Sequence, residues 1–479
     1  MRVFGLVFWF TIWAQAPALA QPQGAQIEAV VERLAEAYGG DRLAALETVS
    51  ISTNRRLAWP GQGQTVSFVE FERDRLRKHF DLVNEHGSVE RWTDQNGNVY
   101  HNRYVVTADG AELIDYFDMT ARPSERGGYW QWFSGDYRSS DLLMAHFLST
   151  TGPEIEHVGT EFYRGHLHDK LAVTVAPETP QAIVYVSRRD GLIRRLNMSR
   201  DIGEVSIIFS AHAATNGVSH ATEIHIYLGD TLTEYLDEFA LTTNAPLADE
   251  IALESGLGAP REPVDLSEMT VDQLAPDAFI VGQGDYSLFV VTGAGAIAVN
   301  AYAGLKQRHE ALQAFLGEEV QLTDVIATHH HSDHMDAVAE AIELGARLHV
   351  TEHGGAFVRE LGPETEDWQV NTLASDDNVG PLSIYIRPTS HAVQNAFVFH
   401  PASGALFQDD HYHGLLASGA TRVQPSAVEM YAIVSALDLD IEYVLSGHAR
   451  KAEAWSEFAE AASRPNASDP CPSRRSICL

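Results

Sequence analysis

The chain has 479 residues, of which 66 are acidic and 33 are basic, so its formal net charge at pH 7 is -33. Nucleic-acid binding needs lysine and arginine to neutralise phosphates, and this charge therefore argues against a nucleic-acid partner. The length exceeds that of one ordinary domain, and we expect two or three, each able to bury its own core.

The first twenty residues have the pattern of a secretory signal peptide. Arg2 precedes an apolar run over residues 3–14, and a small-residue cleavage pattern follows at residues 18–20. The apolar run is short for a bilayer span and is followed by polar residues. We therefore expect residues 1–20 to be removed, no stable membrane span to be left, and the mature protein to be periplasmic or secreted.

The next 230 or so residues, about 21–253, are predicted to form an antiparallel β-rich N-terminal domain that begins with a helix. Residues 25–40 place apolar side chains at helical spacing and end in two glycines, which predicts an amphipathic helix. From about residue 47 to residue 227 short runs of alternating apolar and polar residues follow, which is typical of strands. Turn dipeptides of the hairpin type separate or end these runs: Asn96–Gly97, Asp109–Gly110, Asp190–Gly191 and Asn216–Gly217.

One stretch of this region, residues 126–148, is unusually rich in aromatic side chains: Tyr129, Trp130, Trp132, Phe133 and Tyr137. These rings either fill the core under the sheet, as aromatic side chains do in most proteins, or line an apolar pocket that selects substrates. The sequence leaves both alternatives open.

Residues 254–269 are polar and carry glycine and proline, which predicts a linker. Over residues 270–462 apolar strand patterns alternate with helical patterns, and polar residues gather where the strands end. This order predicts an α/β domain with a site at one edge. The whole chain is therefore expected to be an α+β protein of two domains.

The predicted tail, residues 463–479, holds both cysteines of the chain, Cys471 and Cys478. In an oxidising compartment we expect them to join in a disulfide. Their place near the terminus, far from any histidine cluster, makes them poor candidates for metal ligands.

The segment "THHHSDH" follows an apolar strand pattern in the predicted α/β domain. Alternation along a strand end puts His329 and His331 on one side and His330 on the other. Asp333 and His334 fall in the turn that opens the next helix. Two pairs of candidate metal ligands can thus face one cavity from a single segment.

Further candidate ligands stand at the ends of later strand patterns. One pattern ends at His391, one at Asp409 and Asp410, and one at His448. Imidazoles and carboxylates that converge from several strand ends are the ligands that zinc or iron requires. The sequence therefore predicts a metal site at this edge of the domain.

The spacing His-x-His-x-Asp-His, with the later strand ends in the same order, resembles the motifs of the metallo-β-lactamase superfamily. The resemblance covers about residues 274–449 and implies a four-layer αβ/βα sandwich with two metal ions at its edge. The ligands that it implies are His329, His331 and His391 for one ion, Asp333, His334 and His448 for the other, and Asp410 as the bridge between them.

Three positions depart from the family's common pattern. Asp336, two residues after the final motif histidine, and Asp409, before the bridging carboxylate, stand where family members commonly have glycine. Asn300 ends an early strand that commonly ends in aspartate. Asp409 leaves open which of two adjacent aspartates bridges, and Asn300 reduces the expected support of the motif histidines.

The chemistry that this site implies is hydrolysis. Two divalent ions that share a water supply a hydroxide, because coordination lowers the pKa of water to about 7. Asp333 is the candidate to orient this nucleophile and to pass its proton to the leaving group. The residues after the bridging aspartate, His411, Tyr412 and His413, either reach the substrate or face water.

We therefore expect an exported hydrolase that uses zinc, or alternatively iron or manganese, to cleave an ester, lactone, thioester or amide in a small molecule, which could be apolar. A sulfur dioxygenase with one iron ion, from the same superfamily, is one alternative. The β-rich region also resembles the periplasmic lipoprotein-carrier fold, so a lipid or ligand carrier without catalysis is another. Neither the oligomeric state nor the substrate-binding residues follow from the sequence.

Overall fold

The computed structural model describes residues 23–478, apart from residues 60, 67–69, 126, 178, 261–264, 367–368, 415–419, 421 and 449–450. The predicted signal peptide, residues 1–20, lies outside the described residues. The described part of the chain is mostly β, with several antiparallel sheets and some helices, so the expected α+β class is confirmed at this level. Within that part, no helix is long and apolar enough to cross a membrane.

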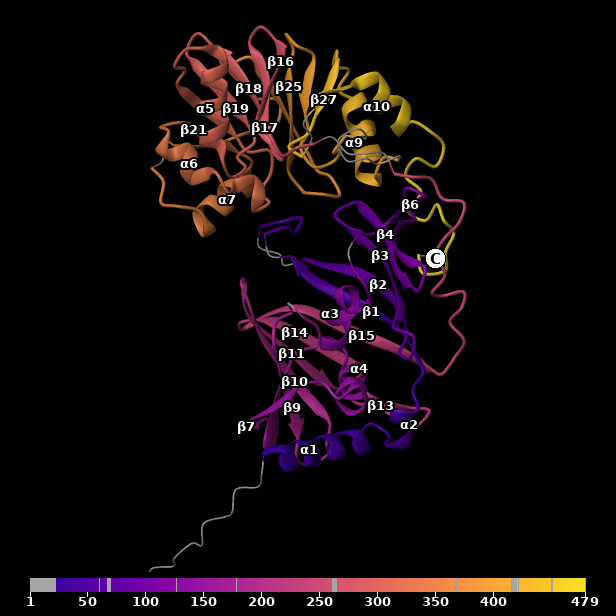
Figure 1. Ribbon diagram of the computed structural model, residues 1–479. Coiled ribbons are helices and arrows are strands. Elements are labelled where there is room, and N and C mark those ends of the chain that lie inside the picture. Colours follow the sequence, from indigo (N-terminus) through magenta and orange to yellow (C-terminus); the bar gives the residue numbers. More distant parts are fainter. Residues whose placement is uncertain are drawn as a thin grey trace, which may run out of the picture.

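The N-terminal half, residues 23–260, contains one large antiparallel sheet with helices packed against it (Figure 1). Its helices are α1 (Gln23–Ala37), α2 (Asp41–Ala44), α3 (Tyr129–Arg138) and α4 (Asp141–His146), and a π-helical turn (Phe147–Thr151) follows α4. Its strands are β1 (Thr48–Trp59), β2 (Glu70–Asp81), β3 (His86–Gln95), β4 (Asn98–Thr107), β5 (Gly110–Asp115), β6 (Thr120–Pro123), β7 (Ile155–Tyr163), β8 (His166–Val173), β9 (Ala182–Ser187), β10 (Ile193–Arg200), β11 (Gly203–Ser210), β12 (Ala213–Thr215), β13 (Val218–His220), β14 (Glu223–Leu228) and β15 (Thr231–Thr243).

Among the described residues, thirteen of these strands form one sheet in the order β6-β5-β4-β3-β2-β1-β15-β14-β11-β10-β9-β8-β7, and β12 pairs with β13 alone. All four predicted turn dipeptides join neighbouring strands. Asn96 and Gly97, between β3 and β4, have φ values of 48° and 79°, as a tight hairpin turn requires.

The last strand of the large sheet, β15, was not predicted from the sequence. It lies between β14 and β1, and its residue Thr243 pairs with Val49, nearly two hundred positions earlier in the chain. The stretch "TLTEYLDEFALTT" has no alternation that marks it as a strand, and its pairing with β1 decides its conformation.

The apolar core of the N-terminal half lies between the sheet and its helices. Tyr129, Phe133 and Tyr137 are buried in this core, and Trp130 and Trp132 pack against it with part of their surface exposed. The aromatic stretch of residues 126–148 therefore fills the core, which is the first of the two alternatives considered from the sequence.

The C-terminal half, residues 265–478, contains two further sheets (Figure 1). Strands of the first are β16 (Thr270–Ala275), β17 (Ala278–Gln283), β18 (Asp285–Thr292), β19 (Gly295–Val299), β20 (Leu322–Ile326), β21 (Arg347–Val350) and β22 (Val370–Thr372). Strands of the second are β23 (Asn378–Val379), β24 (Leu382–Arg387), β25 (Asn395–His400), β26 (Ala405–Phe407), β27 (Tyr443–Leu445) and β28 (Glu453–Ala454). The helices are α5 (Leu305–Leu316), α6 (Val338–Glu343), α7 (Glu352–Leu361), α9 (Pro425–Ser435) and α10 (Trp455–Ala462).

These elements form four layers. Ile280 and Val398 belong to a core between the two sheets, and Leu312 of α5 belongs to a core on the outer side of the first sheet. Met430 of α9 and Phe458 of α10 belong to a core on the outer side of the second sheet. The layer order is therefore helix, sheet, sheet, helix. The central strands of the sheets, such as β17, β19 and β25, are buried on both faces because each sheet is covered on both sides.

Local sequence explains where two of these helices begin. The side chain of Thr351 accepts a hydrogen bond from Gly354 N and so caps α7, which was not predicted from the sequence. Pro425 is the first residue of α9, where its fixed φ suits a helix and its missing N–H has no helical partner to lose.

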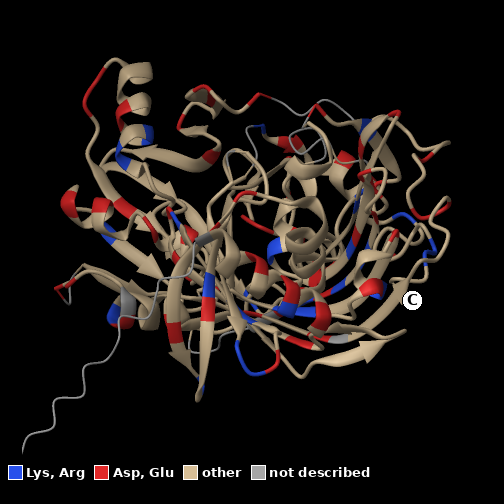
Figure 2. Ribbon diagram, turned by 60° about the horizontal axis from the view of Figure 1, so that its bottom comes forward, with Lys and Arg blue, Asp and Glu red and all other residues tan. Residues whose placement is uncertain are grey.

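Both the predicted linker and the C-terminal tail contact the large sheet of the N-terminal half. Within the predicted linker, residues 254–269, Gly258 hydrogen-bonds to Met119 and Ala121 at the edge of the large sheet, and residues 261–264 lie outside the described residues. The tail returns from the C-terminal half to the large sheet, with a disulfide between Cys471 and Cys478 (Figure 1). Acidic residues are spread along the whole ribbon (Figure 2).

Candidate metal centre

The predicted ligands all lie just beyond strand ends at one edge of the C-terminal half. Residues 329–334 follow β20, His391 follows β24, Asp409 and Asp410 follow β26, and His448 follows β27. The short helical turn Asp333–Met335 directs His334 back toward the strand ends. His329, His331, His334 and His391 are all buried.

Asp410 lies at the centre of the cluster. Its Oδ2 is 2.8 Å from His334 Nε2 and 2.9 Å from His391 Nε2. The same oxygen is 3.5 Å from His329 Nε2, and Oδ1 is 3.1 Å from His448 Nε2. One carboxylate thus reaches imidazoles of both ligand sets that the resemblance implies.

The structure brings the seven predicted ligands together in two groups, and a third group, His329, His334 and Asp409, overlaps both of them. The first group, with one potential ligand atom from each residue within 4.8 Å of the others, is His329, His331, His391 and Asp410. The second group, by the same criterion, is Asp333, His334 and His448.

Most of these histidines are held by a hydrogen bond or ion pair on the ring nitrogen that faces away from Asp410. The partners are Thr328 Oγ1 for His329 Nδ1 (3.1 Å), Gly63 O for His331 Nε2 (3.1 Å), Asp409 Oδ2 for His334 Nδ1 (2.8 Å) and Asp285 Oδ1 for His448 Nδ1 (3.3 Å). Contacts of this kind fix the tautomer and the orientation of a ligating imidazole.

The donor set fits a transition-metal ion. His331 Nδ1 is buried and has no hydrogen-bond partner in the part of the chain that the structure describes, while its Nε2 is bonded to Gly63 O. A buried polar atom without a partner costs free energy, and binding a cation removes that cost. Imidazole nitrogens with carboxylate oxygens are the ligands that zinc, iron and manganese take.

The protonation states of His329, His331 and Asp410 agree with this fit. Burial, and after it the neighbouring imidazoles, lowers the pKa of His329 and His331 well below the usual range, so both are neutral with a lone pair available. Burial alone would raise the pKa of Asp410, but the surrounding imidazoles outweigh burial and hold that pKa well below its usual range. Asp410 is therefore ionised at neutral pH. Burial would lower the pKa of His334 and His448, but neighbouring carboxylates outweigh it and raise the pKa of His334 well above its usual range and that of His448 to about 10, so a metal ion would have to displace a proton from each.

Two departures from the family's common pattern, Asn300 and Asp409, meet behind His334. Asn300 Nδ2 donates to Asp409 Oδ1 at 3.0 Å, and the other oxygen of Asp409 accepts from His334 Nδ1. Asp409 thus gives His334 the neighbouring carboxylate that Asn300 lacks. Asp410 contacts imidazoles of both ligand groups, whereas Asp409 contacts the other ring nitrogen of His334.

The third departure, Asp336, has φ −62° and is exposed at the start of the helical region. This φ is an ordinary helical value that any residue adopts, so the backbone there does not require glycine.

Tyr302 joins the cluster although sequence reasoning did not select it. Its hydroxyl is 2.7 Å from His448 Nε2 and 3.2 Å from His334 Nε2. Tyr302 follows the end of β19 by three residues, beside Asn300, and that position after a strand end is the signal that could have identified it.

The N-terminal half also contributes to the centre, which the sequence did not indicate. The connection between β1 and β2 is described over residues 61–66, here called the 61–66 loop. Gly63 O accepts hydrogen bonds from His330 Nε2 at 2.8 Å and from His331 Nε2, and Gln62 Nε2 donates to Asp333 Oδ1 at 2.7 Å. His330 lies outside the ligand groups, as alternation predicted, but it is buried against this loop.

The residues after Asp410 have different surroundings. Tyr412 hydrogen-bonds to Glu453 and packs against Phe458, so it belongs to the core beneath α10. His411 is buried, and burial lowers its pKa to about 3. The ring of His413 is tilted against that of His448, 5.0 Å away, and His411, Tyr412 and His413 all line one cavity.

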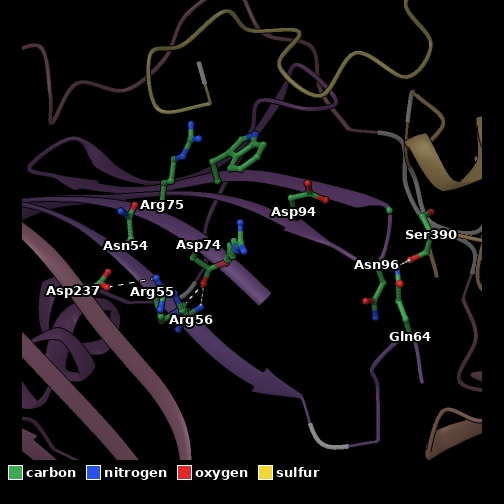
Figure 3. A pocket seen from close by; sticks show the side chains of 13 residues that line it. Asn54, Arg55, Arg56, Gln64, Asp74, Arg75, Asp94, Asn96, Asp237 and Ser390 are labelled. Atoms are coloured by element: carbon green, nitrogen blue, oxygen red, sulfur yellow. Dashed lines mark hydrogen bonds and ion pairs between the residues drawn. The ribbon is translucent and has the colours of Figure 1, made fainter. Parts of the chain in front are cut away.

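Two cavities adjoin the centre. The smaller, of about 160 Å³, has Asp410 and His413 in its wall together with Asn98 and Tyr100 from strand β4 of the N-terminal half. The larger, of about 900 Å³, extends along β1, β2 and β3 to Ser390, the neighbour of His391 (Figure 3). Both cavities therefore take part of their walls from each half.

Comparison with known proteins adds the following. No family model and no curated protein matches the chain. Among solved structures, the chain is similar to a metallo-β-lactamase from Pontibacter korlensis, with 17% identity over 41% of this chain and 100% of that chain and a TM-score of 0.31. A metallo-β-lactamase from Hirschia baltica shows 18% identity over 42% of this chain and 96% of that chain, with a TM-score of 0.31.

A DUF1329 family protein from Desulfovibrio piger is also similar, with 13% identity over 47% of this chain and 95% of that chain and a TM-score of 0.33. Similarities of this size assign no function, and the function proposed below rests on the geometry of the metal centre.

Proposed function

We propose that the protein is an exported metal-dependent hydrolase with a metallo-β-lactamase fold in its C-terminal half, and that it cleaves an ester, lactone, thioester or amide bond in a small molecule. The observation that carries this proposal is the position of Asp410 among four imidazoles of two ligand groups. Zinc is the first candidate for the ions, and iron and manganese suit the same ligands.

Bound divalent ions would lower the pKa of a coordinated water to about 7 and so supply a nucleophile at neutral pH. Asp333 is the residue placed to handle the proton of that nucleophile. Its Oδ1 is fixed by Gln62, and its Oδ2 lies 3.4 Å from His334 Nε2, on the side of the cluster. From there the carboxylate accepts a proton and passes it to the leaving group.

The walls of the two cavities indicate how a substrate would lie. Tyr100 and Asn98 stand beside Asp410 and would contact the bond to be cleaved. The larger cavity is lined mainly by polar and charged side chains of both signs, among them Arg55, Arg56, Arg75, Asp74, Asp94 and Asp237 (Figure 3). This lining favours a substrate with a polar part that extends along β1, β2 and β3.

The proposal is tested by metal analysis of the purified protein together with a panel of substrates. We expect about two transition-metal ions per chain and turnover of at least one ester, lactone, thioester or amide. Asp410→Ala should lose metal from both groups, whereas Asp440→Ala, at an exposed position, should keep it.

An oxygen-consumption assay with a glutathione persulfide, run beside the panel, separates hydrolysis from sulfur dioxygenation. Turnover only in the oxygen assay would assign the dioxygenase alternative. Protein that holds no metal and gains no activity with zinc, iron or manganese would refute an enzymatic role.

A further inference from the structure

A further cavity, of about 220 Å³, lies in the N-terminal half between α3 and the inner face of the large sheet. One side of it is apolar and is formed by side chains of β2, β10, β11, β14 and β15: Leu76, Met198, Val205, Ile207, Ile226 and Leu236. The other side is formed by the C-terminal end of α3, where Arg138 lies. None of the ligands of the metal centre lines this cavity.

Arg138 is buried without the partners that a buried charge requires. Its exposed fraction is 6%, and its Nε and Nη1 have no hydrogen-bond partner among the described residues. A buried cation is costly unless a counter-charge and hydrogen bonds compensate it. The last turn of a helix favours a cation electrostatically, but it leaves these two N–H groups without acceptors.

The other charges of the cavity compensate Arg138 only in part, because the charge of Asp136 raises the pKa of Arg138 less than burial and Arg200 lower it. Four cationic side chains line it, Arg55, Lys78, Arg138 and Arg200, against two carboxylates, Asp136 and Glu234. Lys78 holds Asp136 at 2.7 Å, and Arg55 is 3.3 Å from Glu234. Arg138 and Arg200 are therefore left without a paired carboxylate among the described residues, in a protein whose formal net charge is -33.

The two arginines lie close enough to affect each other. Burial, and after it the charge of Arg200, lowers the pKa of Arg138. Arg200 is the last residue of β10, on the same face as the buried Met198, and is exposed at the rim of the cavity. The cavity thus combines an apolar wall with a buried cation and a second cation at its opening.

We propose that this cavity binds a small monocarboxylic acid with a short hydrocarbon chain. The carboxylate accepts hydrogen bonds from Arg138 and Arg200, since guanidinium groups match a carboxylate with paired N–H donors. The hydrocarbon chain packs against the apolar wall. The volume lies below the 300–1,000 Å³ typical of sites for drug-sized ligands, which limits the ligand to a short chain. The site is independent of the function proposed for the metal centre.

The test is isothermal titration of the full chain with octanoate and with 1-octanol, which has the same tail length and no charge. We expect one octanoate to bind per chain and 1-octanol to bind at least tenfold more weakly. Arg138→Met should weaken octanoate binding at least tenfold and leave 1-octanol binding unchanged. Arg464→Met, which removes an arginine that is 62% exposed at the start of the tail, should change neither.

Thermal unfolding without ligand gives a second readout. If Arg138 only stabilised the fold, Arg138→Met would lower the melting temperature. Removing a buried charge that is compensated only in part should leave the melting temperature of Arg138→Met unchanged or higher, and octanoate should no longer raise it. If Arg138→Met does not fold, Arg200→Met at the rim should weaken octanoate binding at least threefold. The proposal is overturned if octanoate does not bind, if 1-octanol binds equally well, or if the variants that fold bind octanoate like the parent.

Discussion

Asp409 is completely buried behind His334, and its oxygens connect three other side chains at the metal centre: Thr328, Asn300 and Tyr302. From the sequence, Asp409 left open which of two aspartates bridges, and Asn300 reduced the expected support of the motif histidines. Their contact joins the two departures in one exchange of position, in which the carboxylate expected at position 300 stands at position 409 instead. Sequence reasoning could not pair them because they are more than a hundred residues apart.

This exchange predicts the behaviour of a double variant. Asp409→Asn removes the negative partner of His334 Nδ1 and should lower metal affinity about 10- to 100-fold, as the loss of such a supporting group does. Adding Asn300→Asp should recover most of that loss, because Asn300 Oδ1 already lies 3.4 Å from His334 Nδ1. Competition for zinc with a chromophoric chelator measures both. Equal losses in the single and double variants would contradict the exchange.

Tyr302 gives a second prediction, because its hydroxyl stands between His334 Nε2 and His448 Nε2. An ion held by the second ligand group must displace the hydrogen bonds of this hydroxyl. Each of the two bonds contributes about 1 kcal/mol, so Tyr302→Phe should tighten binding of the second zinc roughly 30-fold and leave the first unchanged.

The measurement is a stepwise zinc titration of metal-free protein. Loss of the second zinc in Tyr302→Phe would show instead that the phenol oxygen is itself a ligand.

The 61–66 loop is the element through which the N-terminal half supports the metal centre. Gly61 has φ 75°, and a Cβ there would lie 3.1 Å from Ser332 Cβ, next to Asp333. Gly61→Ala should therefore shift the loop away from His331 and lower metal affinity several-fold, although it changes no ligand.

Gly165→Ala is the matched control for this variant. Gly165 has φ 82°, so alanine is similarly strained there, but a Cβ would have no atom within 4 Å. We expect similar backbone strain in both variants and a metal defect only in Gly61→Ala, as measured by elemental analysis after dialysis. The same metal content in both would show that the loop does not orient His331.

The tail contacts the large sheet through Arg475, whose Nη2 donates a hydrogen bond to Glu90 Oε2 at 3.0 Å. Burial by itself would raise the pKa of Glu90, but hydrogen bonds from His101 and Arg475 outweigh it and hold the pKa at about 2, below the ordinary 4.5. A carboxyl group with a lowered folded-state pKa stabilises the fold above its unfolded-state pKa. This stabilisation is lost as the pH falls from about 4.5 toward 2.

Arg475→Met should therefore lower the free energy of unfolding by about 1–3 kcal/mol at pH 7, because Glu90 is buried and keeps only His101 as a close partner. The difference from the parent should shrink as the pH falls from about 4.5 toward 2, because the parent loses the same interaction over that range. Thermal unfolding at several pH values measures this. A difference that stays constant with pH would contradict a role for the ionised Glu90.

Prediction from the sequence succeeded where the determining interactions are local. Asn96 and Gly97 specify a hairpin turn by their own conformational preferences, and His329 and His331, two positions apart just beyond β20, fall in one group of potential ligands without His330. Prediction from the sequence failed where the determining contacts join segments that are far apart in the chain. Strand β15 is defined by its pairing with β1, and the support of His331 by Gly63 joins positions 268 residues apart.

The two halves should respond together when metal is removed. Because Gly63 and Gln62 hydrogen-bond to His331 and Asp333, chelation of the metal should loosen the 61–66 loop as well as the strand ends. We expect hydrogen exchange over residues 52–66 to accelerate on chelation, with no change over β9 and β10. Acceleration confined to the C-terminal half would show that the loop is held without help from the ligands.

The contact between Gly63 and His331 also bears on how such a protein can be re-engineered. A chimaera that joins residues 265–478 to a different N-terminal partner would keep every metal ligand and lose the carbonyl that orients one of them. Transplanting the C-terminal half therefore requires carrying the β1–β2 hairpin with it, or redesigning a replacement acceptor within about 3 Å of the same imidazole nitrogen. The transferable unit is discontinuous in sequence, and a boundary drawn at the linker would cut through it.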